Sequence, residues 1–158
     1  MFQLFLFLHV TGAVIAFGPN FVFPFLGNAA GREPQHANFA MRLGHVMETR
    51  LIIPVALTML VSGLGLMYFG HIGLDHFWLV AAILIYLAAL TFVFTVMLPN
   101  QHRLVEMTAM AGRAGPGAAP AGPPPELARS VRVSQMGGMA LTAAIVIILG
   151  LMIFRPGG

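Results

Sequence analysis

Long apolar runs alternate along this chain with arginine-bearing segments and one short turn. The four runs lie at residues 3–27, 50–70, 76–98 and 136–154. Each has about the 20 residues that a helix needs to cross ~30 Å of hydrocarbon. Lipid offers no partners to backbone N–H and C=O groups, so runs of this length are expected to be helical. The pattern predicts an all-α fold, an integral membrane bundle of four helices.

Composition supports this class of protein. The chain is 58% hydrophobic and 8% charged, whereas about 25% of residues are charged in an average soluble domain. The first run lacks a preceding positive segment and is too long for a secretion signal, so we interpret it as a retained membrane helix. We expect one domain over residues 1–158. Within it, the Gly/Pro/Ala-rich stretch 112–125 is predicted to be a flexible cytoplasmic linker.

The arginines predict how the helices are oriented. Seven of the eight lie between runs one and two or between runs three and four, and the eighth is Arg155. The positive-inside rule therefore places both long loops in the cytoplasm and both termini outside. Tyr68 and Trp78 then lie near the outer interface, where amphipathic rings are favoured. We expect a multi-pass protein of the bacterial inner (cytoplasmic) membrane.

The partners follow from the same distribution of charge. The formal net charge is +3 and is spread over short loops, whereas a nucleic-acid-binding protein needs a clustered basic patch. We therefore expect contact with the lipid bilayer and with other membrane subunits or a homo-oligomer, and no nucleic acid. No charged residue lies in the middle of any run, which argues against proton pumps and ion-coupled carriers.

The first candidate site lies toward the outer side. His9 is ionisable and lies inside the first run, and such a residue in a membrane helix is a functional hypothesis by default. The short turn brings His71 and His76 to the same side, with Met67 one helical turn before His71. Haem iron takes His/His or His/Met axial pairs, and a four-helix bundle can hold it. The pattern predicts a haem b site with His9 as the buried ligand and His71, His76 or Met67 opposite.

The same helix face also fits a purely structural role. A neutral His9 imidazole can hydrogen-bond to a neighbouring helix, and methionines commonly fill apolar cores. Small and polar residues share the face of His9 at helical spacing, which favours close approach of helices. These residues are Gly12, Ala13, Ala16 and Asn20.

A second candidate site lies on the cytoplasmic side. His45 and Glu48 are three residues apart, and His102 and Glu106 are four apart, so each pair shares one helix face. If the two helix extensions pack together, two His and two Glu meet, a ligand set that suits zinc or non-haem iron. The alternative is a solvated face that forms ion pairs or contacts lipid headgroups. Cysteine is absent, which excludes thiolate metal sites.

Five short segments of the first two runs carry a resemblance to known proteins: Leu8–Gly12, Phe17–Gly18, Phe25–Gly27, Arg50–Pro54 and Ser62–Leu66. They resemble an uncharacterised family of predicted bacterial four-helix integral membrane proteins. More distantly, they are similar to the copper-resistance protein D membrane domain and to the four-helix membrane protoporphyrinogen oxidase. In those relatives a His about ten residues before a Gly recurs, and the oxidase is associated with haem or porphyrin chemistry. His9 and Gly18 match this pattern, whereas Ala16 and Phe17 stand where the relatives carry Trp.

Three functional hypotheses result. The first is a b-type haem or quinone-linked redox protein that acts through His9, as a subunit of a larger respiratory or photosynthetic complex. The second is a cofactor-free accessory subunit whose small-residue faces pack against partner helices. The third is a copper-handling membrane protein that uses the methionines and the outer histidines.

Overall fold

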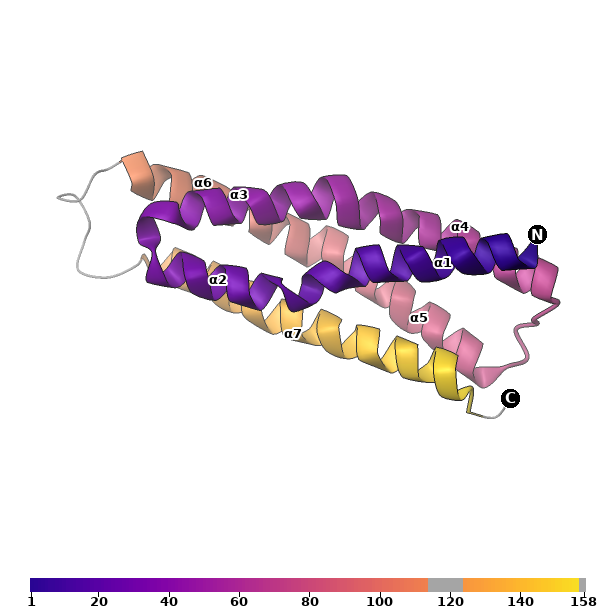
Figure 1. The fold of residues 1–158 in the computed structure, drawn as a ribbon. Coiled ribbons are helices and arrows are strands. Elements are labelled where there is room, and N and C mark those ends of the chain that lie inside the picture. Colours follow the sequence, from indigo (N-terminus) through magenta and orange to yellow (C-terminus); the bar gives the residue numbers. More distant parts are fainter. Residues whose placement is uncertain (114–123, 157–158) are drawn as a thin grey trace.

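Four long helical rods lie side by side in the computed structural model, which describes residues 1–113 and 124–156 (Figure 1). The rods span Phe2–Arg32, Pro34–Gly70, Phe77–Gly112 and Pro125–Phe154, and all four are long and apolar enough to cross a membrane. The described residues contain no strand. The predicted four-helix membrane bundle is therefore confirmed.

Shorter segments make up each rod. The first is α1 (Phe2–Phe17), η1 (Gly18–Phe21) and α2 (Phe23–Arg32). The second is η2 (Pro34–His36), α3 (Ala37–Met47), η3 (Glu48–Ile52) and α4 (Ile53–Gly70). The third is α5 (Phe77–Phe92), η4 (Val93–Met97) and α6 (Leu98–Arg113), and the fourth is α7 (Pro125–Phe154).

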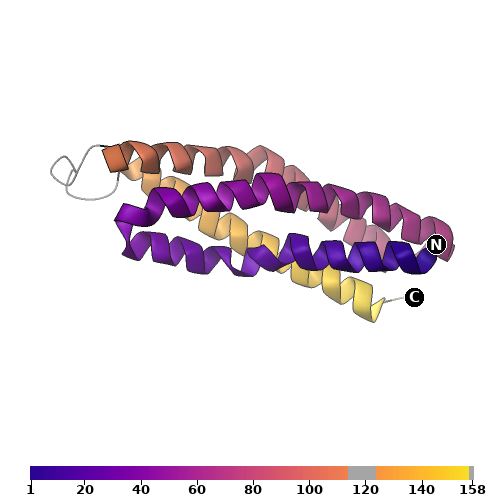
Figure 2. The ribbon, with the colours of Figure 1, turned by 45° about the horizontal axis from the view of Figure 1, so that its top comes forward.

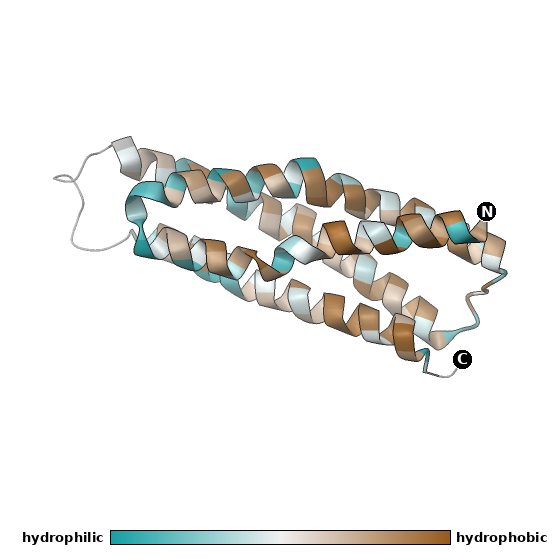
Figure 3. Cartoon of the chain, viewed as in Figure 1, coloured by the Kyte–Doolittle hydropathy of each residue, from teal (hydrophilic) through white to brown (hydrophobic). Residues whose placement is uncertain are grey.

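The rods are longer than the apolar runs alone. They have 31, 37, 36 and 30 residues, or roughly 45–55 Å at 1.5 Å per residue, against ~30 Å of hydrocarbon. The extra turns lie away from the termini. The start of α1, the end of α7 and the turn between α4 and α5 lie at one end, here called the terminal end (Figures 1 and 2). The α2–α3 turn, the end of α6 and the start of α7 lie at the other, the arginine-rich end (Figures 1 and 2). Figure 3 shows hydrophilic residues gathered at the α2–α3 turn.

Two connections between rods follow segments of small, polar or proline-rich sequence. The first is the small, polar stretch 28–40, where α2 continues to Arg32 and Pro34 already begins the next rod. The turn is short because a proline starts a helix well, its missing N–H being one that needs no partner there. At the predicted linker, Gly112 ends the third rod and Pro125 opens the fourth. The stretch between them at 114–123 lies outside the described residues.

The prolines inside the rods are accommodated by changes in helix type. A π-helical turn precedes Pro54, and another precedes Pro99. Proline lacks an N–H and its ring clashes with the carbonyl four residues earlier. In both turns the N–H just before the proline bonds a carbonyl five residues back, which widens the helix there. Both rods therefore continue through their prolines without a loop.

In the first rod, the proline lies in a tighter type of helix. Residues Gly18–Phe21 form a 3-10 segment around Pro19 between α1 and α2. The sequence predicts this break, because Pro19 leaves the Ile15 carbonyl without its helical donor. Pro24 causes no such break, because it lies in the first turn of α2, where the missing N–H has no helical partner to lose.

The apolar side chains mostly face outward. Only 11 to 17% of each apolar window is buried inside the protein, and Phe7, Leu64 and Leu84 are each more than 60% exposed. A monomeric soluble protein rarely exposes contiguous apolar surface on this scale. The outer surface of the bundle is therefore suited to contact with lipid. The helices pack against one another only along narrow lines of contact, here called seams.

The tightest seam joins α1 to α4. A Cβ on Gly65 would overlap the Phe5 ring, and one on Gly70 would lie 2.8 Å from the Phe2 ring. Further along, the Gly12 position faces Met59, which packs with Ala16 and Ala56 in a small core cluster. Glycine here lets two backbones approach closely, as in other membrane helix pairs.

Polar contacts join the rods elsewhere. Tyr86 on α5 donates to the Ala56 carbonyl of α4 at 2.6 Å. At the arginine-rich end, Asn38 Nδ2 donates to the Val105 carbonyl at 3.0 Å, which links α3 to α6. Asn100 Nδ2 donates to the Ser130 carbonyl at 2.9 Å, which links α6 to α7. Because a polar group without a partner is costly in an apolar medium, these bonds fix which helix faces meet.

We expect Gly65→Leu to lower the stability of the bundle by about 1–3 kcal/mol, because the new side chain has to displace the Phe5 ring. The measurement is thermal unfolding in detergent, followed by the helical circular dichroism signal. Gly138→Leu is the matched control, since nothing lies within 4 Å of a Cβ at Gly138. Equal stability of the two variants would show that the α1–α4 seam is not tightly packed.

Candidate functional site

His9 is tied to the neighbouring helix α4. Its Nδ1 lies 3.0 Å from Ser62 Oγ, and Ser62 Oγ donates to the Met59 carbonyl at 3.1 Å. A hydroxyl has one proton, so when Met59 accepts it, His9 Nδ1 is the donor to Ser62. The imidazole lies over Gly63, where a Cβ would be 3.4 Å from His9 Cε1. The expectation that His9 can hydrogen-bond across a helix interface is confirmed.

The predicted haem ligands lie at different levels of the bundle. His9 packs beside Ser62, whereas the turn with His71 begins where Gly70 meets Phe2. Eight residues of helix separate Gly63 from His71, or ~12 Å along the axis. The α1–α4 seam is also too tight at His9 to admit a flat macrocycle without separating the helices. These residues do not fit an axial pair in this arrangement, and haem b binding by His9, His71, His76 or Met67 stays a prediction.

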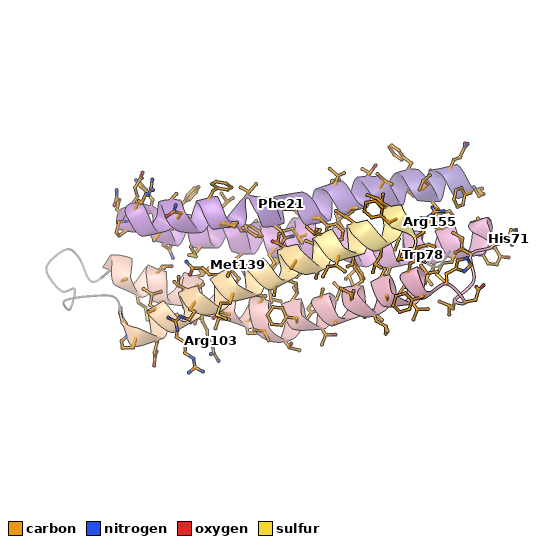
Figure 4. The ribbon with its side chains drawn as sticks, turned by 90° about the horizontal axis from the view of Figure 1, so that it is seen from below. Phe21, His71, Trp78, Arg103, Met139 and Arg155 are labelled. Atoms are coloured by element: carbon orange, nitrogen blue, oxygen red, sulfur yellow. The ribbon has the colours of Figure 1, made fainter. Side chains whose placement is uncertain are left out.

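His71 and His76 instead line a pocket at the terminal end of the bundle. The pocket has a volume of about 280 Å³ and is lined by Gly70, His71, Ile72, His76, Trp78 and Arg155. Three elements form it: the C-terminus of α4, the α4–α5 turn with the start of α5, and the residue that follows α7. We call it the terminal pocket. Figure 4 shows His71, Trp78 and Arg155 at this end.

The local backbone brings these side chains together. His71 adopts a left-handed conformation with φ 52°, which ends α4, and Arg155 does the same with φ 44° at the end of α7. Such a residue closes a helix and reverses the chain direction. The Arg155 guanidinium carbon thereby lies 5.5 Å from the centre of the Trp78 ring, within the range of a cation–π contact.

The polar groups of the terminal pocket are mainly hydrogen-bond donors. Trp78 is 4% exposed, and its Nε1 is buried without a hydrogen-bond partner in the described residues. Indole N–H and guanidinium groups donate and do not accept. His76 Nδ1 donates to Asp75 Oδ1 at 3.0 Å on the exposed side of the turn. That hydrogen bond holds the pKa of the Asp75 carboxyl below its usual value, so Asp75 is anionic at neutral pH.

Sequence reasoning missed two residues of this pocket. Trp78 was expected near the outer interface as an amphipathic ring; it lies at the terminal end (Figure 4), but it is buried, and Arg155 lies over its face. Arg155 was considered only as a charge for orientation. The two positions are 77 residues apart in the chain, and no local pattern links them. The sequence did predict that the short turn brings His71 and His76 to the same side, and this is confirmed because both residues line the pocket.

The second predicted site is partly assembled. The rings of His45 on α3 and His102 on α6 meet edge to face with centroids 5.9 Å apart. His102 Nδ1 lies 3.4 Å from Glu106 Oε1, on an exposed face. Glu48 is buried in η3, and its Oε2 has no partner in the described residues. Over residues 1–113 and 124–156, no three His, Asp or Glu side chains are arranged to hold a metal ion. Metal binding by these four residues stays a prediction.

The fold and its surface define a class of protein, a four-helix integral membrane protein with a donor-lined pocket at one end. Residues 3–156 match the family of predicted integral membrane proteins named domain of unknown function 2269, and the chain belongs to that family. No curated protein and no solved structure matches it. The predicted membrane family is confirmed, whereas the likeness to copper-resistance protein D and to protoporphyrinogen oxidase gains no support from these comparisons.

We expect the His9–Ser62 bond to contribute about 0.6 kcal/mol to stability, the average for hydrogen bonds between membrane helices. A double-mutant cycle of His9→Phe and Ser62→Ala, read by thermal unfolding in detergent, measures this coupling. Thr142→Ala is the matched control, because Thr142 Oγ1 donates within its own helix to the Gly138 carbonyl. A coupling of zero between His9 and Ser62 would show that the bond does not hold α1 to α4.

Proposed function

We propose that this integral membrane protein binds a small anion, with a carboxylate or phosphate group, in the terminal pocket. The single observation that carries the proposal is the buried, unpartnered Trp78 Nε1 beneath the Arg155 guanidinium. A buried donor without a partner costs about 1–3 kcal/mol. A ligand that brings an acceptor oxygen to this donor recovers that energy, and a negative charge on the ligand is further stabilised by Arg155.

The charge at the pocket favours an anion over a metal cation. The Arg155 guanidinium carries a positive charge. A metal ion bound by His71 and His76 would have to approach that charge, and two imidazoles alone make a sparse ligand set. The copper hypothesis also needs Met67, which does not line the pocket.

The size of the pocket restricts the ligand. Drug-sized ligands occupy pockets of about 300–1,000 Å³, and the terminal pocket, at about 280 Å³, lies just below that range. This volume suits a compact acid or an inorganic oxyanion. If the arginines lie inside, as the positive-inside rule expects, the ligand reaches the pocket from outside the cytoplasm.

We expect phosphate or succinate to change the fluorescence of the protein, because Trp78 is its single tryptophan and lines the pocket. Arg155→Gln is expected to weaken the affinity about tenfold or more, since hydrogen bonds to charged groups contribute about 1.5–3 kcal/mol and 1.4 kcal/mol is a factor of ten. The measurement is a titration of the purified protein in detergent.

Two further variants make this experiment decisive. Arg42→Gln removes an exposed arginine at the other end of the bundle and is expected to leave the affinity unchanged. Asp75→Asn removes a negative charge beside His76 and is expected to tighten binding by up to about fivefold, the scale of an exposed charge pair. An unchanged spectrum over the whole titration, or equal affinities of the Arg155 and Arg42 variants, would refute the proposal.

The redox, copper and accessory hypotheses remain distinct proposals with distinct readouts. For a haem b protein we expect a Soret band in protein purified from native membranes, lost in His9→Ala and retained in Ser62→Ala. For a copper protein we expect copper in elemental analysis, reduced in His71→Ala or Met67→Ala. A colourless protein without metal would contradict both. If such a protein also failed to bind anions, the accessory role beside partner helices would remain.

A further inference from the structure

A second cavity lies in the arginine-rich half of the bundle, between α7 and the third rod. It is a groove of about 580 Å³. Its apolar walls include Phe92 of α5, Val96 of η4, and Met136 and Ala140 of α7, and Arg129 and Arg132 line it as well. We call it the arginine groove. It shares no lining residue with the terminal pocket, so it is independent of the function proposed above.

Charge is segregated along this groove. Arg129 and Arg132 lie in the early turns of α7, and the apolar residues follow toward the middle of the helix. Eight residues separate Arg132 from Ala140, or ~12 Å of helix. Both arginines are exposed, and neither forms an ion pair with an acid of the described residues. One end of the groove therefore carries positive charge, and the other end is lined by apolar side chains.

The apolar part of the groove depends on close helix packing beneath it. At Gly137 a Cβ would collide with Met97 Sδ and would lie 3.2 Å from the Phe92 ring, so α7 and the third rod meet there. The π-helical turn η4 supplies Val96 on one wall. Ala140, on the opposite wall, is small and exposed, which leaves the groove open toward the lipid.

This pattern matches an amphiphile with an anionic head. Guanidinium groups bind phosphate oxygens through paired hydrogen bonds, and basic pockets between membrane helices on the cytoplasmic side bind anionic lipid headgroups. A partner membrane helix would cover the apolar walls but would leave both arginines without a counter-charge. Arg103 of α6 lies in the same half of the bundle and adds positive charge there (Figure 4).

We propose that the arginine groove binds one anionic phospholipid. Its phosphate lies against Arg129 and Arg132, and an acyl chain runs along Val96, Phe92 and Ala140. The lipid supplies the missing counter-charge and covers apolar walls that the protein leaves open. It thereby holds α7 to the third rod at the end of the bundle from which the chain continues into residues 114–123.

The test compares phosphatidylglycerol with phosphatidylcholine of identical acyl chains, added to delipidated protein and counted as bound adducts by native mass spectrometry. Phosphatidylglycerol is expected to bind preferentially. Arg129→Gln with Arg132→Gln is expected to weaken its binding about 30-fold, because each basic residue near an anionic surface contributes about 1 kcal/mol and 1.4 kcal/mol is tenfold. Ala140→Phe, which fills the groove without changing charge, is expected to weaken it as well.

Matched controls separate the groove from general lipid contact. Arg42→Gln with Arg50→Gln removes two exposed arginines outside the groove, and Ala143→Phe adds the same bulk on an exposed face of α7; both are expected to bind phosphatidylglycerol as the parent does. Equal binding of the two lipids, or equal losses in groove and control variants, would overturn the proposal. So would glycerol 3-phosphate displacing the lipid at equal concentration, because the site would then recognise the phosphate alone. Circular dichroism confirms folding, and Ala140→Phe keeps the test decisive if the double arginine variant fails to fold.

Discussion

The structure depends on one constraint: in hydrocarbon, each backbone N–H and C=O group must find a partner within the protein. Eleven prolines and eighteen glycines would interrupt helices in many soluble proteins. Here Pro19 lies in a 3-10 segment, and Pro54 and Pro99 each follow a π-helical turn. These changes of helix type keep the backbone groups hydrogen-bonded around each proline. The rods therefore remain continuous where a proline would otherwise interrupt them.

Continuous rods then leave few ways to hold the bundle together. Lipid is as apolar as leucine, so burial of apolar side chains does not drive helices together as it does in water. The chain relies on glycine seams, of which α1 against α4 is the closest, and on single hydrogen bonds between helices. His9 belongs to this second group, because it is bonded to Ser62 at the seam. An ionisable residue in a membrane helix suggests function, but here the seam gives it a structural role as well.

The terminal pocket lies where the rods end, whereas the arginine groove runs from the early turns of α7 toward the middle of the bundle, above the close packing at Gly137. The terminal pocket forms where two left-handed residues end α4 and α7 and bring Arg155 over Trp78. The arginine groove lies between α7 and the third rod, with Arg129 and Arg132 toward one end and Phe92 and Ala140 toward the other. Both cavities place positive charge beside apolar surface, which is the chemistry that an anion or an anionic amphiphile requires. Recognition is therefore proposed at two separate places, one at the terminal end and one in the arginine-rich half of the bundle.

The sequence by itself determined the class of protein, the number of helices and the break at Pro19, because hydropathy and proline chemistry act within about 20 consecutive residues. It also placed His71 and His76 together through a short turn, and it grouped His45 with Glu48 and His102 with Glu106 on single helix faces. It did not reveal that Ser62 bonds His9, that Arg155 covers Trp78, or that Arg129 and Arg132 border a groove with Phe92. Those contacts join residues 37 or more positions apart. Only the tertiary structure decided them, because which helix faces meet depends on where glycines allow close approach, and no local pattern encodes that.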